Sequence, residues 1–187
     1  MLRYANRRAA IRPFASAQES IRLREAIYRD VNRFWGPSWY PAGEISTDYA
    51  EHGLMDPTGM HQFAVDDRST GELVGVVQAG LGGNNAIEGW FGTFIHPQRR
   101  GRGYGVAAKQ LVLNYMFERF PVNRMMSDTL AHHTVACRGM ERCGCVFEGN
   151  IRAARMAEGQ WHDLSRYSIL RREWETMAYR HDVIKGQ

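Results

Sequence analysis

Three β-rich runs follow one another between residues 63 and 96 and are separated only by short polar turns. Phe63 and Val65 mark the first run, the turn at 67–71 leads to the second at 73–81, and the turn at 82–85 leads to the third at 86–96. Runs joined in this way are typical of antiparallel hairpins. The sequence therefore predicts an antiparallel meander that ends at Pro97, because proline cannot donate to a strand ladder.

Helical periodicity flanks the meander on both sides. Ser16 and Glu19 form a capping-box pattern, after which apolar residues recur at helical spacing until Gly36. Further helices are predicted from the glycine-rich segment after Pro97 to about Phe120 and at 133–143. The remaining predictions are strands at 11–14, 123–129, 145–152 and 164–171, a short helix near 47–54 and a frayed helix after Glu173.

No repeat or linker divides the chain, so residues 1–187 are expected to form one domain of mixed α/β class, with a core of about 10–174 and a tail at 175–187. The 24 Lys and Arg exceed the 20 Asp and Glu only slightly, and no nucleic-acid-reading motif is present, so nucleic acid is disfavoured as a partner. No apolar run is long enough for a membrane span, and residues 1–12 lack the apolar core of a signal peptide. We therefore expect a cytoplasmic protein that does not bind a membrane.

The three cysteines, at positions 137, 143 and 145, are an odd number in a chain without a secretory signal, which favours reduced thiols. A zinc site would need a fourth ligand such as His133, and the paired spacing typical of such sites is missing. We therefore expect no metal.

The clearest chemical signal lies between the third β-rich run and the next helix. This segment reads Ile95-His96-Pro97-Gln98-Arg99-Arg100-Gly101-Arg102-Gly103-Tyr104-Gly105. Glycines at a strand-to-helix junction let backbone amides approach an anion, and the start of a helix attracts phosphate. A nucleotide-hydrolase loop would end in Gly-Lys-Ser or Gly-Lys-Thr, and a dinucleotide fingerprint would need a parallel unit. The segment favours a phosphate cradle, with a plain glycine turn and solvated arginines as the alternative.

Several motifs resemble one enzyme family. Arg100-Gly101-Arg102-Gly103-Tyr104-Gly105 resembles the Arg/Gln-x-x-Gly-x-Gly/Ala pyrophosphate signature of the GNAT superfamily of N-acetyltransferases. Glu141-Arg142-Cys143-Gly144 and Phe147-Glu148-Gly149 resemble marks of the branch that acetylates the N-termini of ribosomal proteins. The resemblance covers roughly residues 10 to 174.

The resemblance implies a twisted, mostly antiparallel sheet of about six or seven strands, flanked by about four helices. The fourth and fifth strands are expected to splay apart, with the pantetheine arm of acetyl-coenzyme A between them. A backbone amide near Phe94 or Ile95 would polarise the thioester carbonyl. The cofactor-binding residues implied in this way are Phe94, Ile95, His96, Arg100, Gly101, Arg102, Gly103, Tyr104, Gly105, His133 and Arg142.

An acceptor amine must lose a proton before or during its attack, and an α-amino group does so more readily than a lysine side chain. Glu88, near the start of the fourth predicted strand, is the first candidate for the catalytic base, and a plain surface glutamate is the alternative. Glu148 and Asp128 are further candidates.

The residue that protonates the departing thiolate is harder to assign. This branch usually has Asn and Ser where the chain has His133 and Ala136, and Met140 replaces the tyrosine that other branches use. His133 is therefore the second catalytic candidate, because imidazole titrates near neutrality. The alternatives for His133 are a helix cap or a hydrogen bond to the cofactor.

These features predict an acyl-CoA-dependent N-acetyltransferase that moves acetyl from acetyl-CoA to a primary amine by direct attack on the thioester. The amine is expected on a protein N-terminus or a small molecule, and the aromatic residues 34, 35, 39 and 40 are candidates for its binding site. A longer acyl donor is an open alternative. The alternative of a different class is a catalytically degenerate acyl-CoA-binding sensor, and a nucleic-acid binder is the third hypothesis. The chain is expected to act as a monomer or homodimer.

Overall fold

The structure is a computed structural model that describes residues 3–35, 42–56, 59–82 and 88–186, with only the backbone described for 28–35 and 42. Within these ranges the chain forms nine strands and five α-helices. In chain order they are β1 (Arg3–Ala5), β2 (Ala9–Pro13), α1 (Ala17–Trp35), α2 (Ala42–His52), β3 (Met60–Asp67), β4 (Leu73–Gly82), β5 (Glu88–Ile95), α3 (Tyr104–Arg119), β6 (Arg124–Leu130), α4 (Thr134–Glu141), β7 (Val146–Ala157), β8 (Gln160–Leu170), α5 (Arg171–Trp174) and β9 (Ile184–Gly186).

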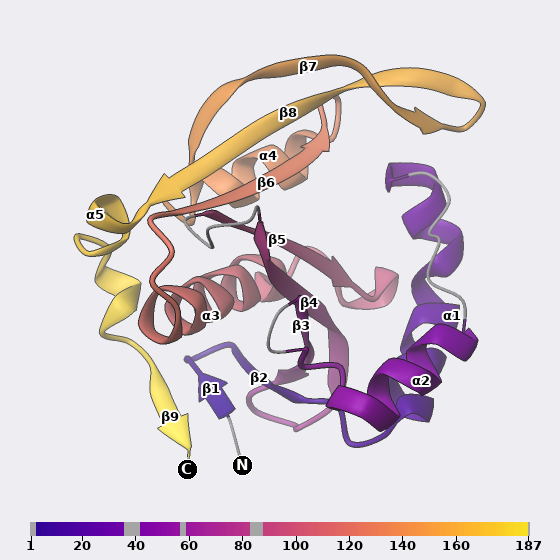
Figure 1. The fold of residues 1–187 in the computed structure, drawn as a ribbon, viewed down its shortest axis with the longest axis vertical. Helices are drawn as coiled ribbons and strands as arrows, with labels where there is room; N and C mark the ends of the chain where they lie inside the picture. Colours follow the sequence, from indigo (N-terminus) through magenta and orange to yellow (C-terminus); the bar gives the residue numbers. More distant parts are fainter. Residues whose placement is uncertain (1–2, 36–41, 57–58, 83–87, 187) are drawn as a thin grey trace.

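The described strands belong to one sheet with the order β7-β8-β6-β5-β4-β3-β2-β1-β9 (Figure 1). Neighbouring strands are antiparallel, apart from the parallel pair β5 and β6. The predicted mixed, mostly antiparallel α/β fold is confirmed, and so is the meander β3-β4-β5. The sheet has more strands than expected because the three-residue strands β1 and β9 extend one edge.

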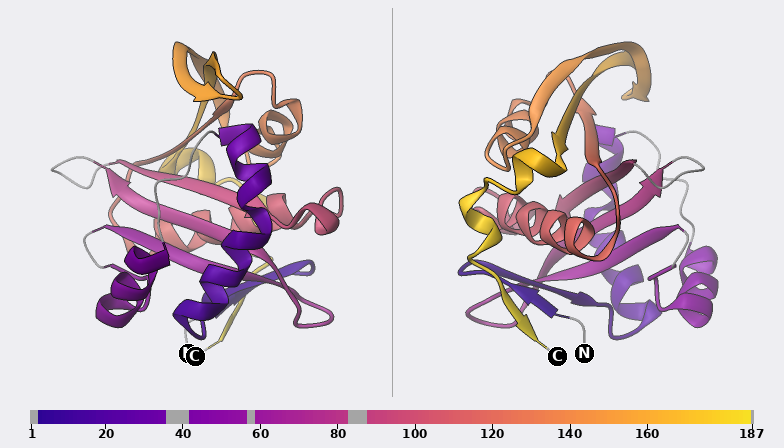
Figure 2. Two further views of the ribbon diagram at one scale, coloured as in Figure 1. Left: turned by 90° about the vertical axis from the view of Figure 1, so that its right-hand side faces the viewer. Right: turned by 60° about the vertical axis from the view of Figure 1, so that its left-hand side comes forward.

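Helices cover both faces of the sheet, as the three views of Figures 1 and 2 show. On one face, α1 and α2 pack their apolar residues against Ala64, Val76 and Phe94 of the central strands. On the other face, α3 packs against β2 to β6, with α4 beside it. No helix in the described ranges has both the length and the apolar character that crossing a membrane would need.

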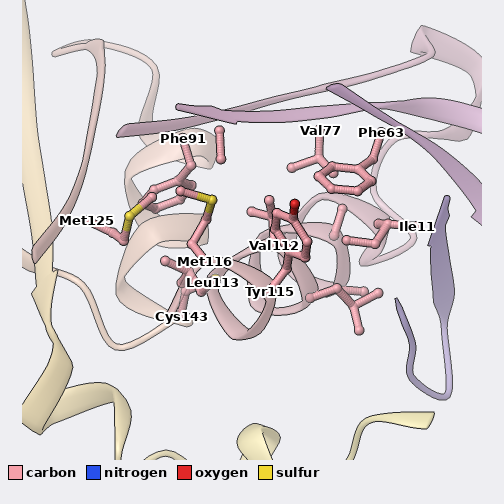
Figure 3. Packing of buried hydrophobic residues seen from close by; sticks show 14 of the residues in the cluster. Ile11, Phe63, Val77, Phe91, Val112, Leu113, Tyr115, Met116, Met125 and Cys143 are labelled. Atoms are coloured by element: carbon pink, nitrogen blue, oxygen red, sulfur yellow. The ribbon is translucent and has the colours of Figure 1, made fainter. Parts of the chain in front are cut away.

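The larger core cluster forms between α3 and the sheet (Figure 3). Val112, Leu113 and Met116 of α3 are fully buried there, together with Phe63 and Val77 of the strands. Each such side chain contributes on the order of 1.5–3 kcal/mol by leaving water. This packing fixes the axis of α3, and with it the position of the glycine-rich segment at its start.

The C-terminal end of α3 is held by a single arginine. The Arg171 guanidinium donates to the carbonyls of Phe117 and Phe120, both at 2.7 Å, and to that of Val122 at 2.9 Å. A cation at a helix C-terminus also interacts favourably with the helix dipole. The helix is therefore anchored at both its packed face and its end.

The last residues differ from the predicted frayed helix. After the single-turn α5, residues Ala178–Arg180 form a 3-10 helix, and Ile184–Gly186 pair with Arg3–Ala5 as β9. The side chains of β9 are exposed, so the strand carries no apolar alternation that a sequence pattern could reveal. Backbone pairing with β1 determines its conformation instead.

Candidate active site

The site begins where β5 and β6 separate. The two strands pair only over Glu88–Trp90 with Arg124–Met126. Beyond Trp90, β5 remains paired with β4, while β6 continues along β8. The predicted divergence of the fourth and fifth strands of the core is therefore confirmed, and the facing edges of β5 and β6 are left without a strand partner.

Alternate residues of β5 direct their backbone groups into this gap. The His96 amide, just after β5, donates to the Val74 carbonyl at 2.9 Å, so it is turned toward β4. Because hydrogen bonding alternates sides along an antiparallel strand, Ile95 and Thr93 present their amides and carbonyls to the gap. The Ile95 amide is thus available to a ligand in the gap, whereas the Ile95 carbonyl accepts from Arg100 and the His96 amide is used within the sheet.

A tight bend leads from β5 into α3. Residues Pro97–Arg99 form one 3-10 turn, after which Gly101 and Gly103 have φ angles of 72° and 85°. This left-handed region is strained for residues that carry a Cβ, so both positions require glycine for the backbone alone. Gly105 has no such requirement, since a Cβ there would make only ordinary contacts.

The amides of residues 101–106 are the chemical feature of this bend. They donate to no acceptor within the described residues, and the first helical hydrogen bond is that of the Ala107 amide to the Gly103 carbonyl, at 3.0 Å. Unpaired amides at the start of a 16-residue helix carry partial positive charge and suit phosphate oxygens. We call this set of amides the 101–106 cradle.

Two side-chain hydrogen bonds fix the cradle to the sheet. The Arg100 Nε donates to the Ile95 carbonyl at 3.0 Å. The Tyr104 hydroxyl donates to the carboxylate of Asp67, the last residue of β3. Hydrogen bonds from Ser69 and from Tyr104 lower the pKa of the Asp67 carboxyl well below its usual range, so the acceptor stays ionised.

A cavity of about 670 Å³ joins the cradle to the gap. Its walls come from β5, the start of α3, β6 and α4, and its size is typical of small-molecule sites. The predicted cofactor-binding residues that line it are Phe94, Ile95, Arg100, Gly101, Gly103, Tyr104, Gly105, His133 and Arg142. His96 and Arg102 are not part of the lining.

A family model of the acetyltransferase (GNAT) domain matches residues 8–146, which include the cradle and all residues that line the cavity. The chain belongs to the GNAT acetyltransferase family. Among curated proteins it is similar to YdaF of Bacillus subtilis (strain 168), whose name assigns it provisionally to the ribosomal N-acetyltransferases. The two are 33% identical over 84 residues, which are 45% of this chain and 46% of YdaF. The matched segment thus spans about half the length of that relative.

Solved structures share the fold over most of the chain. The spermidine N-acetyltransferase of Vibrio cholerae, in complex with CoA and spermine, superimposes with a TM-score of 0.78 and 19% identity, covering 91% of this chain and all of that one (100%). The RimL acetyltransferase of ribosomal protein L7/L12, in complex with coenzyme A, gives a TM-score of 0.74 and 13% identity, covering 87% of this chain and 94% of RimL. At these identities the likeness concerns the GNAT fold alone.

In this GNAT domain His133 stands directly before α4 and lines the cavity. Its side chain makes no capping hydrogen bond to the helix, so the structure gives no support to a role as helix cap. Burial, and then the positive charges of Arg100, His132 and Lys109, lower the pKa of His133. The imidazole is therefore neutral near pH 7, a form that accepts a proton more readily than it supplies one.

The three candidate bases occupy different surroundings. Glu88 lies at the paired end of β5, is half-exposed, stands 3.9 Å from Arg124 and does not line the cavity. Glu148 accepts two hydrogen bonds from Arg124 at 2.6 and 2.5 Å, which with a bond from Ser168 lower the pKa of its carboxyl. Asp128, on β6, is the carboxylate that the cavity lining contains within the described residues.

Asp128 is oriented by a bidentate contact with Arg166 on β8, at 2.8 and 2.7 Å. The pair bridges neighbouring strands, since Asp128 and Arg166 are directly opposite in the β6-β8 register. A fixed carboxylate of this kind can accept a proton or a hydrogen bond from an amine in the cavity. From the sequence, Glu88 is the first candidate for the base and Asp128 a weaker one. The sequence alone does not show which of the two residues lies beside the gap between β5 and β6.

Two of the three cysteines, Cys143 and Cys145, are buried. Burial raises the pKa of Cys143 to about 12 and raises that of Cys145 further, so both are thiols at neutral pH. Within the described ranges, no three His, Cys, Asp or Glu side chains are grouped closely enough to hold a metal ion. The aromatic residues 34, 35, 39 and 40, proposed from the sequence for the acceptor site, lie outside the residues whose side chains the structure describes.

The sequence did not indicate a role for two polar residues of the cavity, Thr93 and Lys109. Thr93 sits on β5 with a buried hydroxyl that finds no partner in the described part of the chain. Lys109 lies on α3 and is 7% exposed. The sequence does place Lys109 between Ala108 and Leu111, which belong to the apolar face of the predicted helix. A lysine so close to that face can indicate a buried charge.

Proposed function

We propose that this chain transfers an acetyl group from acetyl-CoA to a primary amine by direct attack of the amine on the thioester. The observation that carries the proposal is the 101–106 cradle, whose unpaired amides open into the cavity at the mouth of the gap between β5 and β6. A diphosphate needs several donors in one place, and a thin pantetheine chain needs unpaired strand edges. This GNAT domain offers both within one cavity.

Different parts of the cavity would bind different parts of acetyl-CoA. The amides of 101–106 would bind the diphosphate, with Arg100 and Arg142 at the rim. The gap-facing backbone of Thr93 and the Ile95 amide would pair with the pantetheine arm, and one of the two amides would donate to the thioester carbonyl, where negative charge develops. When bound, acetyl-CoA supplies the activated acetyl group, and the protein contributes mainly position.

Proton transfer falls to the side chains at the far end of the gap. Asp128 is the best-placed carboxylate to orient the acceptor amine and receive its proton, directly or through water. Glu88 would act only through a water chain, because it lies outside the cavity lining. His133, whose pKa is lowered, would bind the cofactor as a neutral imidazole, and it would protonate the thiolate only after taking up a proton itself.

The acceptor class follows from the charges around the cavity. A polyamine carries several cations, and binding it would require several free carboxylates. In the described lining, Asp128 is the one carboxylate and is already paired with Arg166, whereas four arginines, Arg99, Arg100, Arg138 and Arg142, line the cavity, of which Arg99 is paired with Glu72. We therefore propose an acceptor with a single amine, such as a protein N-terminus or a small monoamine.

The direct test is release of free thiol from acetyl-CoA in the presence of a panel of peptides and small amines, with intact-mass analysis of the acceptors. The proposal expects an added acetyl mass on at least one acceptor. Gly103→Glu should abolish activity and cofactor binding, because it strains a left-handed position and places a carboxylate in the cradle.

Gly159→Glu is the matched control. Its φ of 77° imposes similar strain in the open turn between β7 and β8, far from the cavity lining. Unchanged coenzyme A affinity in Gly103→Glu would show that the cradle is elsewhere. Tight coenzyme A binding without amine-dependent thiol release for any acceptor would favour the sensor alternative.

A further inference from the structure

Lys109 is a lysine buried at the wall of the cavity. It lies on α3 one turn after Gly105, and helix side chains lean toward the N-terminus. The Nζ atom comes within 3.9 Å of the Cβ position at Gly105 and 4.0 Å of that at Gly139 on α4. The ammonium therefore ends between the cradle and α4, at the wall of the cavity that it helps to line.

Among the described residues, no group balances this charge. Within the described residues Lys109 makes neither an ion pair nor a hydrogen bond. The titratable groups that interact with it are the thiols of Cys143 and Cys145, which are protonated, and His133, which faces the same cavity. Burial lowers the pKa of Lys109 as a result. A buried charge without a counter-ion is costly, so its presence calls for an anion from outside.

The geometry indicates where that anion sits. Lys109 lines the same cavity as the cradle, and its ammonium lies next to Gly105 of the cradle and Gly139 of α4. The cavity lining supplies further cations and, among described residues, one carboxylate that is already paired. A small residue at Gly139 leaves room for the long lysine side chain between the two helices.

We propose that Lys109 binds the diphosphate of the cofactor and is the counter-charge that completes the cradle. This inference rests on the proposed function, because it assumes that coenzyme A occupies the cavity. The amides supply directional hydrogen bonds, and Lys109 supplies a full positive charge in a poorly solvated place. Lys109 should therefore favour acyl donors that contain a diphosphate over acyl donors that contain no phosphate.

The chain contains only two lysines, which provides a matched control. Lys185 on β9 is 54% exposed and pairs with Glu118 at 2.8 Å, far from the cavity lining. Lys109→Met and Lys185→Met make the same chemical change at a buried and a surface position. Calorimetric titration of both variants and the wild type would use coenzyme A, 3′-dephospho-coenzyme A and pantetheine, which lacks phosphate.

The expected result is an affinity loss of about tenfold or more in Lys109→Met for coenzyme A and 3′-dephospho-coenzyme A, in the range of one charge-assisted hydrogen bond. Affinity for pantetheine should not change, and Lys185→Met should behave as wild type. Equal loss for pantetheine, loss for coenzyme A alone, or no loss would each overturn the assignment to the diphosphate. If the wild type itself bound no coenzyme A, the proposed function would fail, and this inference with it.

A second measurement needs no variant. Protein labelled with carbon-13 at the lysine ε position gives two signals, and Lys185→Met assigns them. Coenzyme A should raise the pKa measured for Lys109, because a neighbouring diphosphate favours the charged form, and pantetheine should leave it unchanged. A Lys109 titration that is the same with and without coenzyme A would contradict the proposal even if Lys109→Met proved unstable.

Discussion

Arg100 donates a hydrogen bond of 3.0 Å from its Nε to the carbonyl of Ile95, the last residue of β5. The bond crosses the bend and ties the cradle to the strand edge that faces the gap. One arginine therefore fixes the spacing between the two parts of the cavity that would grip the diphosphate and the pantetheine arm. A side chain as well as the glycines of the bend therefore sets the geometry between β5 and α3.

Asp128→Asn should reduce turnover more than Glu88→Gln does. Asp128 lines the cavity and Glu88 does not, so removing the charge of Asp128 should lower kcat by about tenfold to a thousandfold, the range of a lost general base. Glu88→Gln should stay within about twofold. Steady-state kinetics at saturating acetyl-CoA would check both, and the reverse order would return Glu88 to the role of base.

His133→Asn should slow turnover while leaving the KM for the acceptor nearly constant. His133 lines the cavity at the start of α4, where its contribution would be made to the cofactor or to the departing thiolate. The wild-type rate should also show an ionisation below the ordinary imidazole value, because burial and neighbouring cations lower the pKa of His133. A pH–rate profile that is the same in variant and wild type would leave His133 with a structural role only.

Spermine and spermidine should be poor acceptors compared with a peptide that has one free α-amino group. The described cavity lining contains a single, already paired carboxylate, and a polyamine would bring several cations beside Arg99 and Arg142. Competition between spermidine and such a peptide, followed by mass spectrometry, would measure the ratio of kcat/KM values. Preferential acetylation of spermidine would contradict this account of the acceptor side.

Stability should fall as the pH drops below about 6.5, in part because of His61. His61 is 5% exposed, lies 2.6 Å from the Tyr115 hydroxyl through Nδ1, and has a buried Nε2 without a partner in the described residues. Burial lowers its pKa, with a smaller opposing effect from Asp56. Between the unfolded and the folded pKa only the unfolded chain takes up the proton, so acid favours unfolding, by at most about 1.4 kcal/mol per pH unit.

The corresponding measurement compares denaturation midpoints at pH 7.5 and 5.5. His61→Phe should lose less stability over this interval than the wild type, although its absolute stability at pH 7.5 will be lower because the Tyr115 hydroxyl loses its partner. Some acid sensitivity should remain, since His133 titrates in the same direction. His52→Phe, at a 42% exposed position, serves as the control and should show the wild-type interval.

Much of this fold could be predicted from local sequence patterns. The meander β3-β4-β5 is visible because its turns contain glycine and polar residues, and α3 because Leu111, Val112 and Tyr115 recur on one face. The strands β1 and β9 could not be predicted, because three-residue segments carry too little pattern and gain their order from each other. Pairing across the sheet is a property of the tertiary structure.

The candidate site likewise has features that the sequence predicts and features that it does not. The glycine bend could be predicted because the positive φ angles at positions 101 and 103 favour glycine, and glycine can be read directly from the sequence. The roles of Asp128, Glu88 and Lys109 could not, because they depend on which strand lines the gap and on how far a side chain reaches between α3 and α4. The spacing of residues along the chain predicts neither the strand that lines the gap nor the reach of the Lys109 side chain.

The most direct test of the central claim is a titration of nitrogen-15-labelled protein with coenzyme A, followed through its backbone amide resonances. The amides of residues 101–106 should show the largest shifts, because they have no acceptor in the described structure and would gain one in the diphosphate. The amides of Thr93 and Ile95 should follow, and that of Gly159 should not move. Binding of coenzyme A that leaves residues 101–106 unperturbed would contradict the account.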